Sequence, residues 1–395
     1  MKFFRSLGFE LNELKRFENL EQEERQIVFY SENKNSFFIF ESLINQLTNV
    51  YNYDICYVTS SKDEPIFQTT NKKIKTFCIG EGAIRTKFFL NLQADVLLMT
   101  MPDLETFYIK KSKIYPVHYV CIFHAMVSTH LMYNKHAFDH FDSIFCVGQH
   151  QIDEIRSTEK LYNLKPKQLI KFGYNHLDNL IEKYSKKDNF HLKIKNPIQV
   201  LVAPSWGKDG LFETISEELI DILLNASYKV VLRPHPMTQK KSSKKISYLE
   251  KKFSSNPNFV LELDIPNFDS FLASHLMISD WSGVAFEFAF AFERPVLYVD
   301  VPKKMHNPDY ADIPQIPIEE TIREKIGIIV PKSELETIPK HIEKLCNELE
   351  KWEKDMKEIR EKTIFNVGNS TVKGAQEIIE ILNHLKDKQS KEKLS

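Results

Sequence analysis

The sequence lacks the features that mark membrane-spanning and disulfide-bonded proteins. None of its apolar runs reaches the ~20 residues that a bilayer-spanning helix needs; the nearest, Leu276–Val301, contains Asp280 and Arg294. Its first residues, Met1–Phe17, carry charges throughout and have no apolar core of a signal peptide. The five cysteines include no C-x-x-C pair and mostly lie in apolar runs, which predicts buried free thiols in a reducing cytosol.

The sequence also has no excess of charge and no pattern typical of a metal site. Its 53 basic residues balance 54 acidic ones, giving a formal net charge of -1. No global basic excess indicates nucleic-acid binding, so an anionic ligand must be held by a local site. No D-x-D triplet, H-E-x-x-H motif or Cys/His cluster occurs, and we therefore expect no required metal or other cofactor beyond a donor nucleotide.

Short apolar runs alternate with amphipathic, helix-like segments along most of the 395 residues. This alternation predicts an α/β fold with parallel sheets covered by helices. The strand-like runs are Gln26–Tyr30, Tyr53–Thr59, Thr76–Ile79, Asp95–Thr100, His118–Phe123, Ser143–Val147, Gln168–Phe172, Ile198–Ala203, Lys229–Arg233, Phe259–Leu261, Leu276–Ser279, Val296–Val299 and Gly327–Val330.

A polar, lysine-rich stretch divides this pattern into two halves. Ile181–Pro197 has little apolar periodicity, and we interpret it as an interdomain linker. We predict a Rossmann-like acceptor domain over 1–185 and a Rossmann-like nucleotide-donor domain over 198–370. A C-terminal helix and polar tail over 371–395 would pack back on the first domain. Two such domains with a cleft between their sheets form the GT-B architecture.

In a parallel sheet, ligand-binding residues directly follow the strands. One predicted strand ends in Ser279-Asp280-Trp281-Ser282-Gly283 and leads into an apolar helix containing Glu287. Small residues and a helix N-terminus at this point suit a phosphate group, with Ser279, Asp280, Ser282 and Gly283 as donor-binding candidates. The alternative is a simple N-cap of the helix.

Two more strand ends carry polar residues. After Lys229–Leu232 come Arg233 and His235, which Pro234 and Pro236 hold rigidly. A cation and an imidazole at this position suit a diphosphate that must release a nucleotide. After Val200–Ala203 comes Ser205, which could donate to a phosphate oxygen, followed by Trp206, for which a packing role is equally consistent.

These three segments together resemble the CDP-glycerol glycerophosphotransferase family, the teichoic-acid and capsule polymerases and primases. The family's A-P-T-W, R-P-H-P and S-D-Y-S-S segments correspond here to Ala203–Trp206, Arg233–Pro236 and Ser279–Gly283, and its aromatic-acidic helix to Phe286–Phe288. Asn366–Ser370 is similar to the family's closing N-x-G-x-S. The arginine that commonly follows A-P-T-W is missing, because Gly207 stands there.

The resemblance implies a transferase. A polyol phosphate of the glycerol or ribitol type would move from a CDP-activated donor to a hydroxyl of a glycan or lipid-linked acceptor, releasing CMP. His124, in Phe123-His124-Ala125, stands where the family has W-H-G-T-P-L-K and would be the catalytic base, although the Pro-Leu-Lys portion is absent. His235 would be the second catalytic residue. Arg233, Ser205 and the residues from Ser279 onward would bind the donor, and Glu287 its ribose.

Two other functions stay open on the sequence alone. One is a GT-B glycosyltransferase that uses a nucleotide sugar for capsule or lipopolysaccharide synthesis. The other is a non-catalytic nucleotide- or glycan-binding subunit of a capsule-assembly complex, which the altered motif around His124 motivates. We expect a cytoplasmic protein without a nucleic-acid partner. Peripheral contact with the inner face of the membrane is a further expectation, because the family's acceptors are lipid-linked and Lys2–Phe9 mixes basic and aromatic residues.

Overall fold

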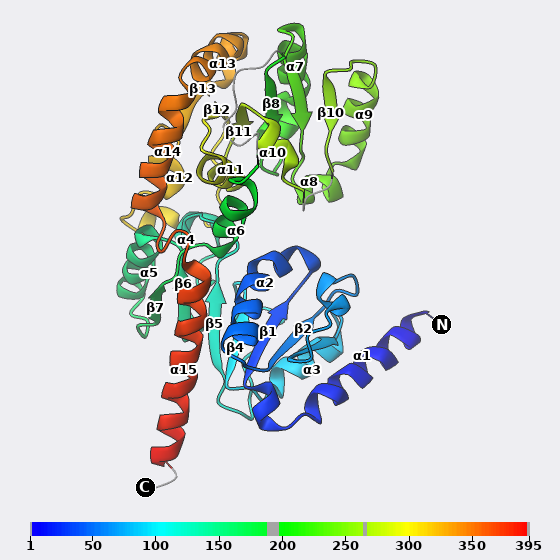
Figure 1. The fold of residues 1–395 in the computed structure, drawn as a ribbon, viewed down its shortest axis with the longest axis vertical. Helices are drawn as coiled ribbons and strands as arrows, with labels where there is room; N and C mark the ends of the chain where they lie inside the picture. Colours follow the sequence, from blue (N-terminus) through cyan, green and yellow to red (C-terminus); the bar gives the residue numbers. More distant parts are fainter. Residues whose placement is uncertain (1, 188–196, 264–266, 393–395) are drawn as a thin grey trace.

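Two parallel β-sheets form the two halves of the chain (Figure 1). This computed structural model describes residues 2–187, 197–263 and 267–392. Within these residues, one sheet has seven strands in the order β3-β2-β1-β4-β5-β6-β7, and the other has six in the order β10-β9-β8-β11-β12-β13. Both orders start at a central strand, run to one edge and then return to the other side. This is the Rossmann order, so the predicted pair of Rossmann-like sheets is confirmed.

Each strand-like run of the sequence forms a strand whose ends differ from the predicted ones by at most two residues. Strands such as β1 and β11 are buried along their whole length because helices cover both faces of the sheets. The strands are β1 (Ile27–Ser31), β2 (Ile55–Thr59), β3 (Ile74–Cys78), β4 (Val96–Met99), β5 (His118–Ile122), β6 (Ser143–Cys146), β7 (Gln168–Lys171), β8 (Gln199–Val202), β9 (Lys229–Leu232), β10 (Phe259–Leu261), β11 (Leu276–Ser279), β12 (Val296–Asp300) and β13 (Gly327–Pro331).

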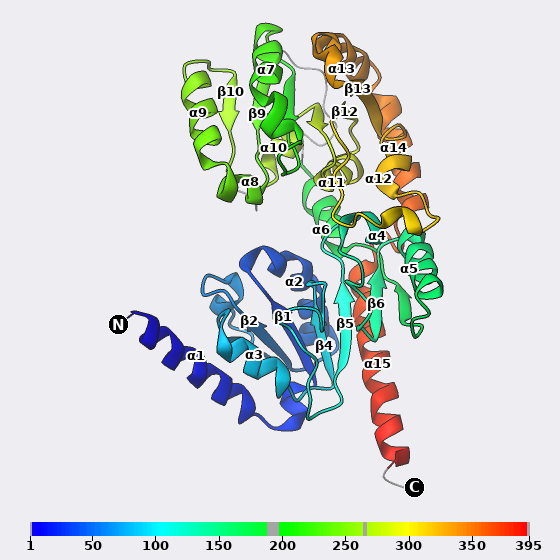
Figure 2. The ribbon, with the colours of Figure 1, turned by 180° about the vertical axis from the view of Figure 1, so that it is seen from behind.

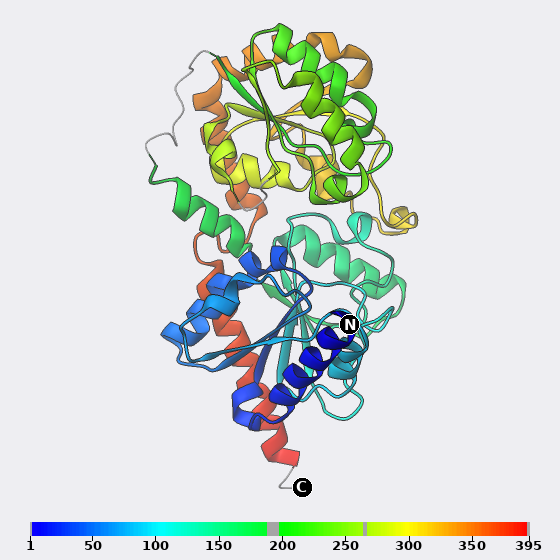
Figure 3. The same cartoon turned by 90° about the vertical axis from the view of Figure 1, so that its right-hand side faces the viewer.

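Helices connect the strands and cover the sheets, as Figure 3 shows for the second half. They are α1 (Lys2–Glu18), α2 (Phe37–Asn45), α3 (Ala83–Leu90), α4 (Thr129–Met132), α5 (Gln149–Leu161), α6 (Asn175–Tyr184), α7 (Leu211–Asn225), α8 (Pro236–Lys241), α9 (Ser243–Phe253), α10 (Asp269–Ala273), α11 (Val284–Phe292), α12 (Ile318–Ile322), α13 (Ile338–Asn347), α14 (Leu349–Thr363) and α15 (Ser370–Glu392). In the described part of the chain, none is long and apolar enough to cross a bilayer.

The two halves pack against each other through α6 and α11. The rings of Tyr184 and Phe292 lie 5.3 Å apart, and the apolar core of the first half continues into α11. Hydrogen bonds add to this contact: Ser128 N donates to Glu319 Oε1 over 2.9 Å, and His130 Nε2 lies 3.0 Å from the carbonyl oxygen of Gln315. The junction is therefore partly apolar and partly hydrogen-bonded.

The end of the chain returns from the second half to the first (Figures 1 and 2). Asn366 Nδ2 donates to the carbonyl oxygen of Lys171 over 2.6 Å, and the backbone amides of Gly368 and Ser370 donate to the carboxylate of Asp178. These bonds give the closing N-x-G-x-S segment a docking role. Helix α15 then packs against α2 and α6. The domain limits at 185, 198 and 370 stay predictions, and most of the linker Ile181–Pro197 lies outside the described residues.

Gly374 allows α15 to approach the first half closely. A Cβ at this position would lie 2.4 Å from Phe172 Cε2 and 2.8 Å from Leu43 Cδ2. We therefore expect Gly374→Ala to lower the free energy of unfolding by about 1–3 kcal/mol through overpacking. Gly8→Ala in α1 is the control: its Cβ would meet nothing within 4 Å, so helix propensity predicts a gain of up to ~1 kcal/mol. Denaturant unfolding measures both, and equal effects of the two substitutions would contradict this packing.

Candidate active site

The carboxyl ends of the two sheets face each other across the junction, with α4 and α8 on opposite sides (Figure 2). His124 follows β5 in one half, and His235 follows β9 in the other. Their side chains are close enough for the charge of His124 to contribute to the lowered pKa of His235. A Cβ on Gly283, at the start of α11, would lie 3.0 Å from Val127 Cγ1. The turn after β5 and the N-terminus of α11 therefore meet at this site.

Asp280 joins the two strand-end turns at the topological switch point of the second sheet, between β8 and β11. Its carboxylate accepts hydrogen bonds from Ser205 N over 2.7 Å, Ser205 Oγ over 3.1 Å and Leu211 N over 2.9 Å. Both Ser205 and Asp280 are buried. The two residues predicted to bind the donor are therefore bonded to each other, and in this conformation they shape the site from beneath.

Ser279 and Arg233 are also directed at protein groups. The fully buried hydroxyl of Ser279 donates to the carbonyl oxygen of Ala203 over 2.7 Å. Arg233 Nη1 donates to Glu262 Oε2 and to the carbonyl oxygen of Asn267, each over 2.7 Å. This guanidinium is a fixed structural cation at the end of β9. Contact of these residues with a donor stays a prediction, and the geometry assigns their side chains to the support of the strand ends.

His235 is held as a neutral imidazole with a defined tautomer. Its Nδ1 accepts the backbone N–H of Met237 over 3.0 Å, which leaves the ring proton on Nε2. Burial, together with the charges of Lys304 and His124, lowers the pKa of His235 to about 3. At neutral pH this side chain is therefore a hydrogen-bond donor without a charge, which suits an oxygen of a phosphate group.

His124 and Glu287 are linked through Tyr174, which follows β7. The phenol lies 2.8 Å from the carbonyl oxygen of His124 and 3.0 Å from Glu287 Oε1. His124 is an exposed residue. Desolvation by the surrounding protein lowers the pKa of its imidazole, and a hydrogen bond with the backbone of Thr100 acts in the opposite direction. Burial raises the pKa of Glu287 to about 7, although Tyr174 and Arg233 act in the opposite direction. An uncharged imidazole at neutral pH is ready to accept a proton.

A group of aromatic and basic side chains surrounds Trp206, which follows β8. The ammonium groups of Lys241 and Lys304 lie 4.5 and 4.6 Å from the centre of its ring. The rings of His235 and His306 lie 6.3 and 5.7 Å away. Lys304 and Tyr174, absent from the sequence-based candidates, each follow a predicted strand by a few residues, so the strand-end rule applied to β12 and β7 would have found them.

Ser282 and Gly283 begin α11 beside this group and are partly exposed. Gly283 is the N-cap of α11, and the amides of Ala285 and Phe286 donate to the carbonyl oxygens of Ser282 and Gly283 over 3.2 and 3.1 Å. Anion binding by the amides of Ser282 and Gly283 stays a prediction, which the positive end of the helix dipole favours. In the described residues, no cluster of three or more His, Cys, Asp or Glu side chains could hold a metal ion.

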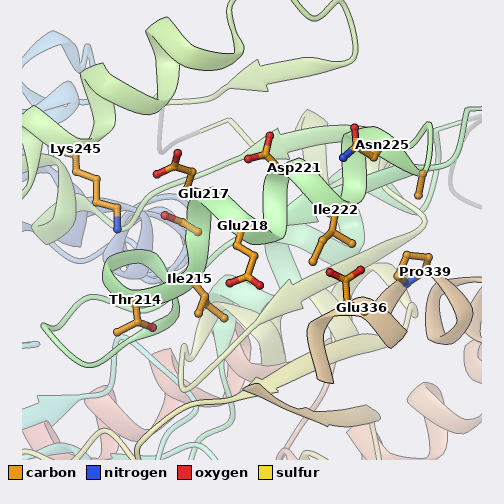
Figure 4. A pocket seen from close by; sticks show the side chains of 12 residues that line it. Thr214, Ile215, Glu217, Glu218, Asp221, Ile222, Asn225, Lys245, Glu336 and Pro339 are labelled. Atoms are coloured by element: carbon orange, nitrogen blue, oxygen red, sulfur yellow. The ribbon is translucent and has the colours of Figure 1, made fainter. Parts of the chain in front are cut away.

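A surface hollow of about 760 Å³ lies elsewhere, along α7 (Figure 4). Glu217, Glu218 and Asp221 line it from α7, and Glu336 lines it from the opposite side. Lys252 pairs with Glu217 and Asp221 at distances of 2.9 and 2.5 Å. Its charged lining residues are these four carboxylates and one lysine, Lys245, a balance that disfavours a nucleotide phosphate.

Two Rossmann-like halves that meet at the carboxyl ends of their sheets define a protein of the GT-B class. A family model described as CDP-Glycerol:Poly(glycerophosphate) glycerophosphotransferase matches residues 13–317. The chain belongs to this family, so the resemblance predicted from its motifs is confirmed.

Two relatives and two solved structures illustrate the similarity. The teichoic acid glycerol-phosphate primase of Bacillus subtilis strain 168 is 26% identical over 164 residues, which are 40% of this chain and 40% of the primase. The minor teichoic acid biosynthesis protein GgaB of the same strain is 28% identical over 189 residues, 40% of this chain but 19% of GgaB. The matches thus span well under half of each relative.

The solved structures show the fold. The wall teichoic acid polymerase TagF, in a structure obtained with a CDPG soak, superposes with a TM-score of 0.61 at 14% identity, and the match covers 98% of both chains. The UDP-GlcNAc 2-epimerase of Methanocaldococcus jannaschii gives a TM-score of 0.52 at 14% identity, over 91% of this chain and 99% of the epimerase. The predicted GT-B fold is confirmed.

The bonds of Asp280 predict a structural role for this carboxylate. Asp280→Ala leaves Ser205 N and Leu211 N as buried donors without an acceptor, and we expect a loss of about 2–4 kcal/mol in the free energy of unfolding. Asp209→Ala, an exposed aspartate in the same loop, is the control and should change it by less than ~0.5 kcal/mol. Urea unfolding of wild type and both variants measures these changes. Equal stability of Asp280→Ala and wild type would contradict the structural role of Asp280.

Proposed function

We propose that this chain transfers a polyol phosphate from a CDP-activated donor to a hydroxyl of a surface-polysaccharide or lipid-linked acceptor, releasing CMP. Glycerol phosphate is the group that the family's description names. The observation that carries the proposal is the pairing of His124 and His235 across the junction of the two sheets, at the strand ends where a parallel α/β fold binds its ligands.

The proposed reaction is an in-line displacement at phosphorus. His124 accepts the proton of the acceptor hydroxyl, and the acceptor oxygen forms a bond to the distal phosphorus of the donor. The bond between this phosphorus and the bridging oxygen breaks, and the electron pair leaves with CMP. The Nε2–H of His235 and the amides of Gly283 and Val284, at the start of α11, would stabilise the charge that develops on the leaving phosphate. Glu287 would accept hydrogen bonds from the ribose hydroxyls.

A sugar transfer by the same fold is the second candidate, because the epimerase with a similar fold is named for UDP-GlcNAc. The product distinguishes the two. Phosphorus appears in the new linkage as a phosphodiester in ³¹P NMR only if a polyol phosphate is transferred. A chain that binds a nucleotide but produces neither product would be the non-catalytic subunit of a capsule-assembly complex.

We further propose a cytoplasmic location with peripheral contact to the membrane face that carries the acceptor. Support comes from α1, which extends away from the first half (Figure 1) and exposes Leu7 and Phe9. Apolar side chains of this kind on a helix with nearby basic residues suit the interface of a bilayer.

His124→Ala is expected to lower kcat by roughly 100- to 10,000-fold, the usual contribution of a general base, while CDP still binds. Because the pKa of His124 is lowered, wild-type kcat/KM should fall only at pH values below ~6.5, as the imidazole becomes protonated. Transfer is measured with radiolabelled donor, and CDP binding by calorimetry.

The control for this variant is His136→Ala in the same half, where an exposed imidazole bonds to Asp139. It should retain wild-type transfer. An unchanged kcat in His124→Ala would exclude the proposed base.

The second expectation for this reaction is that transfer requires no metal ion. We expect transfer to persist in excess EDTA, because side-chain donors and the α11 amides would neutralise the leaving group. The rate before and after chelation, with Mg²⁺ added back, measures this. Loss of activity with EDTA and recovery with Mg²⁺ would contradict it.

A further inference from the structure

A diphosphate bound at the carboxyl end of the second sheet would require a cation within reach, and Arg233 is poorly suited to that role. Its Nη1 is bonded to Glu262 and to the backbone of Asn267, and its guanidinium lies 5.0 and 5.3 Å from the rings of Phe271 and Phe268. Only 6% of the residue is exposed. A positive charge that is already neutralised and enclosed adds little attraction for an anion.

Lys304 offers a different positive charge at the same edge of the sheet. It follows β12 and lies over Trp206, which it shares with Lys241. No hydrogen bond or ion pair of its ammonium group occurs within the described residues. The ionisable groups facing it are Asp280 from the β11 turn, His235 from the β9 end and His306 from its own loop.

The one carboxylate near Lys304 is already occupied by other donors. Asp280 accepts two backbone amides and one hydroxyl, and it acts on Lys304 only through its charge. Burial lowers the pKa of Lys304 to about 8, with Asp280 acting in the opposite direction. A buried ammonium group that has lost hydration and has no bonded anion is destabilised in its charged form. A negatively charged ligand would therefore stabilise it.

We infer that Lys304, placed over Trp206 beside Lys241, binds the diphosphate of the nucleotide-activated donor and acts together with the Nε2–H of His235. Trp206 keeps two ammonium groups at the mouth of the sheet through cation–π contacts, so that they are in position before the donor arrives. Lys304 would thereby supply the charge that the sequence lacks after Ala203–Trp206, where Gly207 takes the place of the family's arginine. The inference rests on the proposed function.

Calorimetric titration of the full chain with CDP at pH 7 tests this assignment. Lys304→Met should weaken CDP binding by about 10- to 100-fold, the usual range for one hydrogen bond to a charged group, and should weaken CMP binding less. Lys303→Met is the matched control: the neighbouring lysine bonds to Glu320 over 2.7 Å, and its removal should leave CDP affinity unchanged. Thermal unfolding of each variant verifies that it is folded.

The pH dependence gives a readout that a purely structural lysine would not show. Lys304 is charged below its pKa of about 8, so wild-type affinity for CDP should fall as pH rises through 8. Lys304→Arg keeps its charge in this range and should bind CDP without this decline. Equal CDP affinity of Lys304→Met and wild type, or identical pH profiles of Lys304→Arg and wild type, would overturn the inference.

Two further outcomes separate this inference from the proposed function. A wild-type chain that binds neither CDP nor CDP-glycerol would contradict both. If the wild-type chain binds CDP, but with no higher affinity than Lys304→Met, only the inference is contradicted. Titration with poly(glycerophosphate) distinguishes the phosphate sources: a loss of polymer binding with unchanged CDP binding would place Lys304 in the acceptor site instead.

Discussion

The buried carboxylate of Asp280 is the constraint on which the donor side of the site depends. It joins the turn after β8 to the turn after β11 at the point where the strand order reverses, by accepting two amides and one hydroxyl. This fixes Ser205, and with it the position of the next residue, Trp206. The aromatic ring in turn positions Lys304 and Lys241. A single buried carboxylate thus helps to determine where the positive charges beside Trp206 lie.

The fold was predictable from the sequence because buried parallel strands are short, continuous apolar runs. Runs such as Leu276–Ser279 and Phe259–Leu261 coincide with β11 and β10 as predicted. The connection between the halves was less accessible to this reasoning. It depends on ring packing between Tyr184 and Phe292, and on the hydrogen bond between Ser128 and Glu319, which are 191 residues apart. No local pattern in the sequence encodes such contacts.

The candidate site was predictable in place but not in the direction of its side chains. The strand-end rule located Ser205, Ser279 and Arg233 at the mouth of the sheet, where they lie. It could not tell that their polar groups bond to protein atoms, because strand-end turns leave buried amides and carbonyls that nearby side chains satisfy first. Lys304 lies five residues beyond the predicted strand Val296–Val299, within reach of the same rule, but only its contact with Trp206 distinguishes it from a solvated surface lysine.

The charge at the mouth of the second sheet depends on pH, because His235 is a neutral imidazole and Lys304 has a lowered pKa. His235 contributes a proton on Nε2 without a positive charge, because Met237 fixes its tautomer and burial lowers its pKa. In the proposed reaction, Lys304 therefore carries the charge that the leaving phosphate requires, because the guanidinium of Arg233 is already paired with Glu262. A desolvated ammonium group binds a phosphate more strongly than a hydrated one, because its hydration has been lost before the ligand arrives. The same desolvation allows Lys304 to lose its proton as pH rises through its pKa of about 8.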